Sequence, residues 1–133
     1  MNVLFVCKGN VARSQIANAF FNKLSEKNKS VSAGTVVGEK EGESLHEFVI
    51  KCMTEEGLDL SKNKRKQLTP EMVILADRII VIAEKENLPD YLTNSNKIIF
   101  WKINDPKNMS YEYCIKVKNE IKTYVKRLVK EIG

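Results

Sequence analysis

The chain has 133 residues, of which 43% are hydrophobic and 29% are charged, and these values are ordinary for a soluble globular protein. A chain of this length can build one hydrophobic core but not two, so we expect residues 1–133 to form a single domain. The net charge of +5 favours acidic or phosphorylated partners, but the excess is spread along the chain and does not indicate nucleic-acid binding.

The apolar runs and the cysteines indicate where the protein works. No apolar run reaches the ~18 residues of a membrane span, and the first run has no basic leader, so we expect neither a membrane nor a secreted protein. The three cysteines, Cys7, Cys52 and Cys114, are widely spaced and indicate neither a disulfide framework nor a zinc site. We therefore expect a cytoplasmic protein with free thiols.

The first element of the chain is a strand that is followed closely by a helix. Residues 3–7 are all apolar and end at Cys7, a pattern typical of a parallel strand that is buried on both faces. From Gln15 onward, apolar residues recur on one helical face, which predicts a helix. The loop between them is therefore short, and Gly9 and Asn10 allow it unusual backbone angles.

This loop is a candidate site for a phosphate-sized anion, because its backbone N–H groups and the positive end of the helix dipole can converge on one point. Arg13 adds a planar guanidinium that can bind two oxygens of a tetrahedral anion at once. The same positive field stabilises a thiolate, so Cys7 is a candidate nucleophile beneath a bound phosphoryl group. The candidate phosphate-binding residues are Lys8, Gly9, Asn10, Val11, Ala12, Arg13 and Ser14.

The remaining elements alternate between strands and helices. Short runs rich in apolar and β-branched residues predict three more strands, the first of them polar enough for a sheet edge. These strands are expected at residues 29–33, 78–82 and 97–101. Residues 36–42 are expected to form a loop. Helices are expected at residues 43–56 and 110–132, with shorter ones after Thr69-Pro70 and within residues 84–96.

Several residues outside the loop have an ordinary structural interpretation. Cys52 and Cys114 fall on apolar helix stripes, so we expect both to be core residues. His46, the only histidine, lies beside such a stripe and is expected to be a partly exposed helix residue, with a place in the lining of the cleft as the less favoured alternative. A basic cluster is expected to be solvated surface, and a weaker hypothesis is that it draws phosphorylated substrates to the site. This cluster consists of Lys62, Lys64, Arg65 and Lys66.

Asp105 is the second candidate for a chemical role. Alternating strands and helices predict parallel pairing through right-handed crossovers, so the carboxyl ends of the strands meet at one edge, where ligands bind. Cys7 ends the first strand and Asp105 follows the fourth after a short spacer, so both can face one crevice. A carboxyl group held there by Pro106 can protonate a leaving oxygen. Cys7, Arg13 and Asp105 are thus the candidate catalytic residues.

These features resemble the low-molecular-weight protein tyrosine phosphatase family, which includes thiol-linked arsenate reductases. The resemblance rests on the run CKGNVARS at residues 7–14 and on the distant Asp105-Pro106, and it covers essentially the whole chain. It implies a three-layer α/β fold in which a four-stranded parallel sheet, in the order 2-1-3-4, has helices on both faces.

The resemblance also implies a two-step mechanism that needs neither a metal nor a cofactor. Cys7 attacks phosphorus and forms a cysteinyl-phosphate, while Arg13 and the loop amides hold the equatorial oxygens. Asp105 protonates the leaving oxygen and then activates a water that releases phosphate. In the family pattern Ser14 hydrogen-bonds the thiolate and Asn10 maintains the strained shape of the loop. The implied substrates are phosphorylated proteins, above all phosphotyrosine, or small aryl phosphates, and inorganic phosphate or another oxyanion can occupy the site.

Two departures from the family pattern bear on this assignment. Position 12 is Ala12, where many of these phosphatases have a second cysteine that protects the nucleophile as a disulfide. After Asp105-Pro106 many of them carry tyrosines that wall the substrate pocket, whereas this chain has Lys107, Asn108 and Met109. The first departure removes that oxidative protection, and the second weakens the case for phosphotyrosine peptides.

The first alternative function is a thiol-dependent arsenate reductase. Gln15 and Trp101 resemble that branch of the family. The reaction needs further thiols to supply electrons, and residues 82–85, after the third strand, contain no cysteine. Because Cys52 and Cys114 are expected to be buried, we do not expect them to reach the site.

The second alternative is a non-catalytic module that binds phosphate or a phosphoprotein. Such a module requires the anion-binding loop but neither a nucleophile nor a general acid. The chain has both Cys7 and Asp105 in place, and this favours an enzyme.

Overall fold

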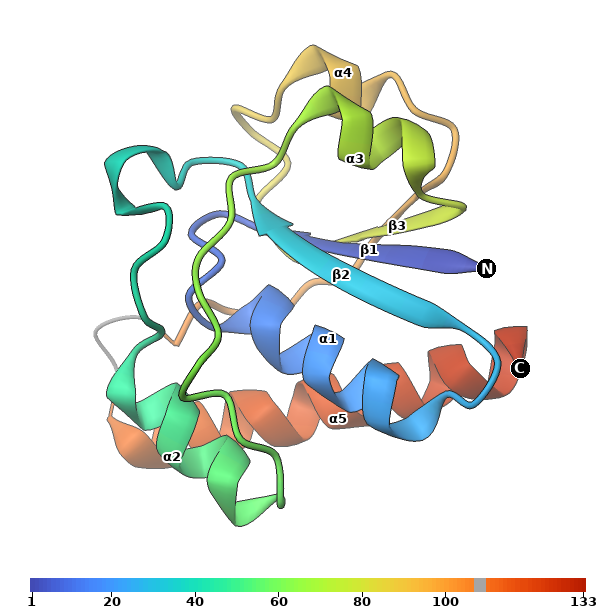
Figure 1. The fold of residues 1–133 in the computed structure, drawn as a ribbon. Coiled ribbons are helices and arrows are strands. Elements are labelled where there is room, and N and C mark those ends of the chain that lie inside the picture. The colour runs from blue at the N-terminus through green and yellow to red at the C-terminus, as the bar shows by residue number, and fades with distance from the viewer. Residues whose placement is uncertain (107–109) are drawn as a thin grey trace.

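The computed structural model describes residues 1–106 and 110–133, which form a central sheet between two layers of helices (Figure 1). The sheet has four parallel strands in the order β2-β1-β3-β4. The strands are β1 (Asn2–Cys7), β2 (Lys29–Gly34), β3 (Arg78–Val81) and β4 (Ile98–Phe100). The predicted fold class, strand order and parallel pairing are therefore confirmed.

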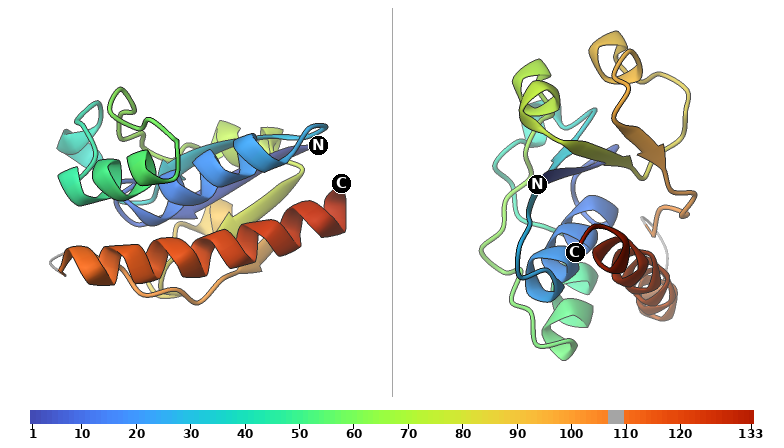
Figure 2. Two further views of the ribbon diagram at one scale, coloured as in Figure 1. Left: turned by 90° about the horizontal axis from the view of Figure 1, so that it is seen from below. Right: turned by 90° about the vertical axis from the view of Figure 1, so that its right-hand side faces the viewer.

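Helices cover both faces of this sheet (Figure 2). One layer contains α1 (Arg13–Leu24) and α5 (Tyr111–Ile132), with α2 (Glu47–Glu55) beside α5; the other contains α3 (Pro70–Leu75) and α4 (Asp90–Thr93). Phe5 belongs to the apolar core on the α1 and α5 side, whereas its neighbour Leu4 belongs to the core on the α3 side. Both faces of β1 are thus buried, as its unbroken apolar run predicts.

The segment before α2 differs from the prediction. The helix begins at Glu47 rather than at residue 43, because Nδ1 of His46 accepts a hydrogen bond from the N–H of Phe48 at 3.0 Å and caps the helix. His46 is therefore a capping residue and not a residue within the helix. The predicted loop at residues 36–42 contains a short 3-10 turn, η1 (Gly38–Lys40).

α5 carries the predicted apolar stripe, but one of its lysines is not solvated. Lys118 is only 6% exposed, and its Nζ lies 2.9 Å from Oε2 of Glu56. Nζ of Lys122 lies 2.8 Å from the other oxygen of the same carboxylate. Hydrogen bonds from Lys122 and Lys118 lower the pKa of Glu56 to about 2. This ion-pair cluster joins the end of α2 to the middle of α5.

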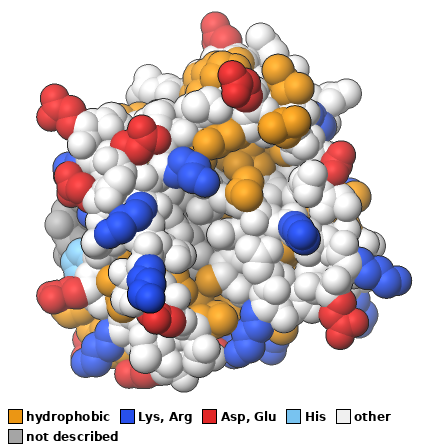
Figure 3. Space-filling model, viewed as in Figure 1, with side chains coloured by type: hydrophobic (Ala, Val, Ile, Leu, Met, Phe, Trp, Pro, Cys, Tyr) orange, Lys and Arg blue, Asp and Glu red, His pale blue; other side chains and the backbone are white. Residues whose placement is uncertain are grey.

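The surface seen in Figure 3 carries charges of both signs and one apolar patch over α3. Ile74 and Leu75, both on α3, are each 74% exposed. In the part of the chain that the structure describes, no helix is long and apolar enough to cross a membrane.

Candidate active site

The loop between β1 and α1 is formed as its sequence predicts, but the helix begins two residues earlier, at Arg13. Arg13 and Ser14 are therefore buried residues of the first helical turn. The residue before the helix, Ala12, has no side chain that can cap it. The first N–H groups of α1 are thus not satisfied by a side-chain cap at this position, which leaves them available to an anion.

Asn10 stabilises the shape of the loop from within. Its backbone has a φ of 52°, a left-handed conformation that is unfavourable for most residues other than glycine and asparagine. Nδ2 of Asn10 donates to the hydroxyls of Ser14 (2.7 Å) and Ser32 (3.1 Å). Its Oδ1 accepts from the N–H of Lys66 and from Nε2 of Gln15, each at 2.9 Å. The buried amide therefore ties the loop to α1, β2 and residue 66.

Ser14 connects this network to Cys7. The Ser14 Oγ lies 2.9 Å from the Cys7 Sγ and accepts a hydrogen bond from Nδ2 of Asn10. The hydroxyl oxygen receives the hydrogen bond from Asn10, and the Ser14 proton can be directed at the sulfur. A hydroxyl group that donates a hydrogen bond to the sulfur stabilises a thiolate more than a thiol.

The end of β2 supports the loop from outside. The N–H groups of Thr35 and Val36 donate to the carbonyls of Cys7 and Lys8, both at 2.9 Å. The chains approach so closely that a Cβ added at Gly34 would lie 2.7 Å from the oxygen of Lys8 and 2.9 Å from the nitrogen of Asn10. Only glycine fits at this contact without a shift of the loop backbone.

Arg13 links the loop to the segment that carries Asp105. Its side chain is only 2% exposed, and its Nη1 donates to the carbonyl of Ile103 at 3.1 Å. Its Nη2 lies 3.5 Å from Oδ2 of Asp105, and Nη1 lies 3.9 Å from the largely exposed carboxylate of Glu84. The guanidinium is therefore oriented by groups that follow β3 and β4, the strands on one side of β1.

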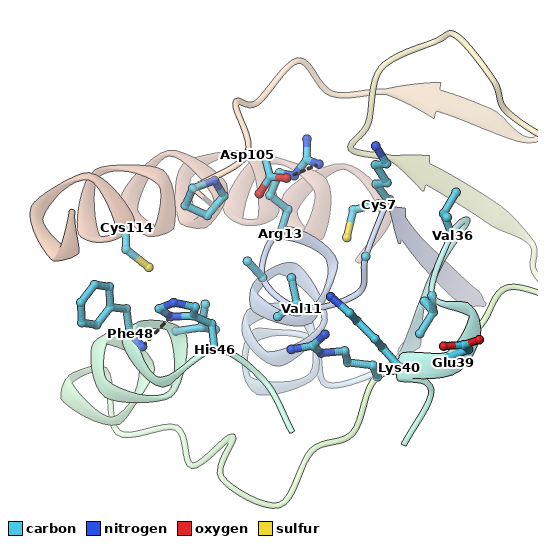
Figure 4. Close-up of a pocket in the computed structure, with 17 residues that line it drawn as sticks. Cys7, Val11, Arg13, Val36, Glu39, Lys40, His46, Phe48, Asp105 and Cys114 are labelled. Carbon is cyan, nitrogen blue, oxygen red and sulfur yellow. Dashed lines mark hydrogen bonds and ion pairs between the residues drawn. The ribbon is translucent and has the colours of Figure 1, made fainter. Parts of the chain in front are cut away.

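The loop and the segment that carries Asp105 border one cavity of about 500 Å³ (Figure 4). The three candidate catalytic residues, Cys7, Arg13 and Asp105, all line it. Among the candidate phosphate-binding residues, Asn10 and Ser14 lie buried behind the cavity wall. The others, Lys8, Gly9, Val11, Ala12 and Arg13, line the cavity.

Apart from His46, for which a place in the cleft is the less favoured prediction, the far wall of the cavity is made by residues that the sequence patterns do not identify. It contains His46 and Phe48 at the start of α2, Cys114 on α5, and Lys40 of η1. The rings of His46 and Phe48 are 5.0 Å apart. Histidine is not among the residues preferred at a helix N-cap, so the cap at His46 could not be predicted from the sequence, and the other wall residues have no local pattern.

The structure divides the predicted basic cluster between two places. Of the basic cluster, Arg65 lines the cavity with Cys7, whereas Lys64 and Lys66 line a smaller depression elsewhere. Lys107, Asn108 and Met109, which follow Asp105-Pro106, lie outside the described residues.

The two remaining cysteines are buried, as predicted, but they are not simply packing residues. Cys52 is 0% exposed and Cys114 is 3% exposed, and their sulfurs lie 3.8 Å apart. Cys114 also lines the cavity that contains Cys7. The expectation that neither thiol reaches the site is therefore wrong for Cys114.

Comparisons with known proteins agree with this architecture. The family model for low molecular weight phosphotyrosine protein phosphatases matches residues 2–133. The pig protein of that name is 32% identical over 102 residues, covering 73% of this chain and 63% of the relative. Arsenate reductase 1 of Staphylococcus epidermidis is 26% identical over 129 residues, covering 92% of this chain and 91% of the relative.

A solved structure extends the comparison to three dimensions. Vibrio vulnificus Wzb, in complex with benzylphosphonate, superposes with a TM-score of 0.88 at 23% identity and covers 98% of both chains. This likeness is one of fold. With the family match over nearly the whole chain, it shows that the protein belongs to the low molecular weight phosphotyrosine protein phosphatase family, a group of enzymes in which both phosphatases and arsenate reductases occur.

Proposed function

We propose that the protein is a metal-independent phosphatase that hydrolyses phosphate monoesters, with phosphotyrosine in proteins or small aryl phosphates as substrates. The observation that carries this proposal is the convergence of Cys7, Arg13 and Asp105 on one cavity. A nucleophile, an anion-binding fork and a carboxylic acid are the three groups that transfer of a phosphoryl group to sulfur requires.

In the first step, the Cys7 thiolate attacks phosphorus and the bond to the leaving oxygen breaks. The Ser14 hydroxyl, 2.9 Å from Sγ, stabilises the thiolate before the attack. Arg13 and the N–H groups of residues 8–14 bind the equatorial oxygens, on which negative charge spreads in the transition state. Asp105 gives its proton to the leaving oxygen, which departs as a neutral alcohol or phenol.

In the second step, the cysteinyl-phosphate is hydrolysed. Asp105, now ionised, removes a proton from a water molecule that attacks phosphorus and releases phosphate. The ion pair with Arg13, at 3.5 Å, supports this role because it holds the carboxylate beside the phosphoryl group. The benzylphosphonate in the Vibrio structure supports a phosphoryl group with an aromatic substituent as the ligand class of this fold.

The test is the release of nitrophenol from p-nitrophenyl phosphate. We expect Cys7→Ser to abolish turnover and Asp105→Asn to lower kcat by about 10²–10³-fold. Unchanged turnover in Cys7→Ser would contradict the proposal. Phosphate binding without turnover in the unmodified protein would favour the non-catalytic module.

A second candidate function, arsenate reduction, has one observation in its favour. Cys114 lines the cavity of Cys7, and the Cys52 thiol lies directly behind it. Two thiols supply the two electrons that convert arsenate to arsenite, and they become a disulfide. Turnover of arsenate with an added thiol, in the absence of aryl phosphate hydrolysis, would establish this alternative. Either activity needs a reduced Cys7, so we infer that the protein works in a reducing compartment such as the cytoplasm.

A further inference from the structure

Two thiols outside the proposed phosphatase mechanism lie in contact with one another. Cys52 on α2 and Cys114 in the first turn of α5 are 62 positions apart in the sequence, yet their sulfurs are 3.8 Å apart. A disulfide needs a separation of about 2.05 Å, so the two sulfurs must approach each other by a further ~1.8 Å for the bond to form. Both thiols are free in the structure.

The two sulfurs have different surroundings. Cys114 lines the active-site cavity across from Cys7, whereas Cys52 is fully buried behind it and its Sγ lies 3.4 Å from the carbonyl oxygen of Val49 (Figure 4). The hydrogen bond between the two sulfurs and the positive charge of Lys118 lower the pKa of the Cys114 thiol, against the opposing effect of burial. The same hydrogen bond and burial raise the pKa of Cys52. Because Cys114 lines the cavity and Cys52 does not, an oxidant that enters the cavity meets Cys114 first.

We propose that Cys52 and Cys114 form a reversible disulfide when hydrogen peroxide enters the active-site cavity, and that this bond ties α2 to α5. The Cys114 thiolate attacks one peroxide oxygen, the O–O bond breaks, and Cys114 becomes a sulfenic acid while hydroxide leaves and is protonated to water. The Cys52 thiol then attacks the Cys114 sulfur, the S–O bond breaks, and a second water leaves with the thiol proton. Two thiols are oxidised by two electrons, and one peroxide is reduced to two waters.

The position of this bond gives it a structural consequence for the site. Phe48 on α2 and Cys114 on α5 both line the cavity, and the ring of Phe48 packs 5.5 Å from the ring of Tyr111 on α5. A covalent link between the helices fixes this wall and leaves Cys7 out of the bond. The inference does not depend on the reaction that Cys7 performs.

The test uses Cys7→Ser, which leaves Cys52 and Cys114 as the only thiols of the chain. After treatment with about one equivalent of peroxide, we expect the loss of both titratable thiols, a mass decrease of about 2 Da and a monomer on a non-reducing gel. We also expect the thermal midpoint to rise by roughly 5–15 °C, because the bond closes a long loop, and dithiothreitol to restore the original value. Two retained thiols, separate sulfinic acids or a disulfide-linked dimer would overturn the proposal.

A matched pair of variants tests the order of the steps. In Cys7→Ser/Cys52→Ser the reaction stops at the Cys114 sulfenic acid, so we expect dimedone to label the protein. In Cys7→Ser/Cys114→Ser the remaining thiol, Cys52, is fully buried and does not line the cavity, so we expect its labelling to be at least about tenfold slower. Equal or reversed labelling rates would show that Cys114 is not the entry point.

Discussion

The anion-binding loop and the far wall of the cavity are built in different ways. The loop at residues 7–14 is one continuous stretch, and its polar side chains are buried in a network centred on Asn10. The wall is assembled from η1, the start of α2 and the start of α5, and it includes exposed groups such as Lys40. Because the two regions are built from different segments, we expect their effects on kinetics to differ. Changes in the loop should lower kcat, whereas changes in the wall should raise KM.

Among changes that leave both Cys7 and Asp105 in place, Arg13→Lys should have the largest effect. Lysine keeps the positive charge but loses the fork that contacts Ile103 and Asp105 and that would bind two oxygens of a phosphoryl group. We expect kcat for p-nitrophenyl phosphate to fall by about 10²–10³-fold with a smaller change in KM. Steady-state kinetics measure this split, with the thermal midpoint as a control for folding. A rise in KM alone would mean that the loop serves binding only.

Asn10→Ala should lower the free energy of unfolding by about 2–4 kcal/mol. It leaves the buried hydrogen-bond partners of the Asn10 amide unpaired and places alanine at a positive φ. The matched control is Asn87→Ala, where an exposed asparagine has a φ of 63°. For this control we expect the free energy of unfolding to fall by only about 1 kcal/mol, because alanine is less stable than asparagine in the left-handed backbone conformation. Chemical denaturation of both variants gives the comparison. Equal losses would show that the hydrogen-bond network contributes little.

Glu56→Gln tests the wall without touching the loop, since Glu56 joins α2 to α5 through Lys118 and Lys122. The folded pKa of Glu56, about 2, lies below its ordinary value, so its ionised form contributes stability above pH ~5 that is lost as the pH falls toward 2. We expect the variant to lose on the order of 2 kcal/mol at pH 7, with little change in kcat.

The pH dependence of this difference is its sharpest test. Thermal midpoints of Glu56→Gln and of the unmodified protein should differ most above pH 5 and converge as the pH falls through the folded pKa of about 2, below which the carboxyl group is protonated in both states. The control is Glu120→Gln, on the exposed side of α5, which should match the unmodified protein throughout. A difference that is independent of pH would exclude the charge on Glu56 as the cause.

The smallest expected effect is that of Lys40→Ala at the rim of the cavity. An exposed charge contributes little in water, so KM for an anionic substrate should rise only about two- to fivefold, with kcat unchanged. The rise should shrink in high salt because the rim is screened. Lys27→Ala, an exposed lysine that does not line the cavity, is the matched control. A fall in kcat at Lys40 would remove the distinction between loop and wall.

The same distinction explains what could be predicted from the sequence. The strand, loop and helix at residues 2–24 are encoded locally, by an apolar run, a glycine-containing turn and helical spacing, so their approximate positions can be predicted from the sequence. Asp105 could be placed because parallel strands bring their carboxyl ends to one edge. These features depend on periodicity and topology.

The wall could not be predicted in this way, because it depends on contacts between distant segments. Phe48 and Cys114 face the cavity only because α2 packs against the start of α5. The contact between Cys52 and Cys114 and the burial of Lys118 beside Glu56 have the same origin. From its helical spacing alone, a cysteine on an apolar stripe is interpreted as a core residue and a lysine opposite it as a surface residue. The spacing within one helix does not reveal which residue of another helix each side chain contacts.

Gly34 shows that the loop also has an outer boundary. A methyl group at this position would press on the Lys8 carbonyl and the Asn10 amide nitrogen together, and on Cγ2 of Val37 at 2.7 Å. The anion-binding loop can therefore keep its curvature only because the residue of β2 that packs against its outer side has no side chain. A single missing carbon atom, outside the cavity and unable to touch a ligand, helps to set how closely the amides can gather around an oxyanion.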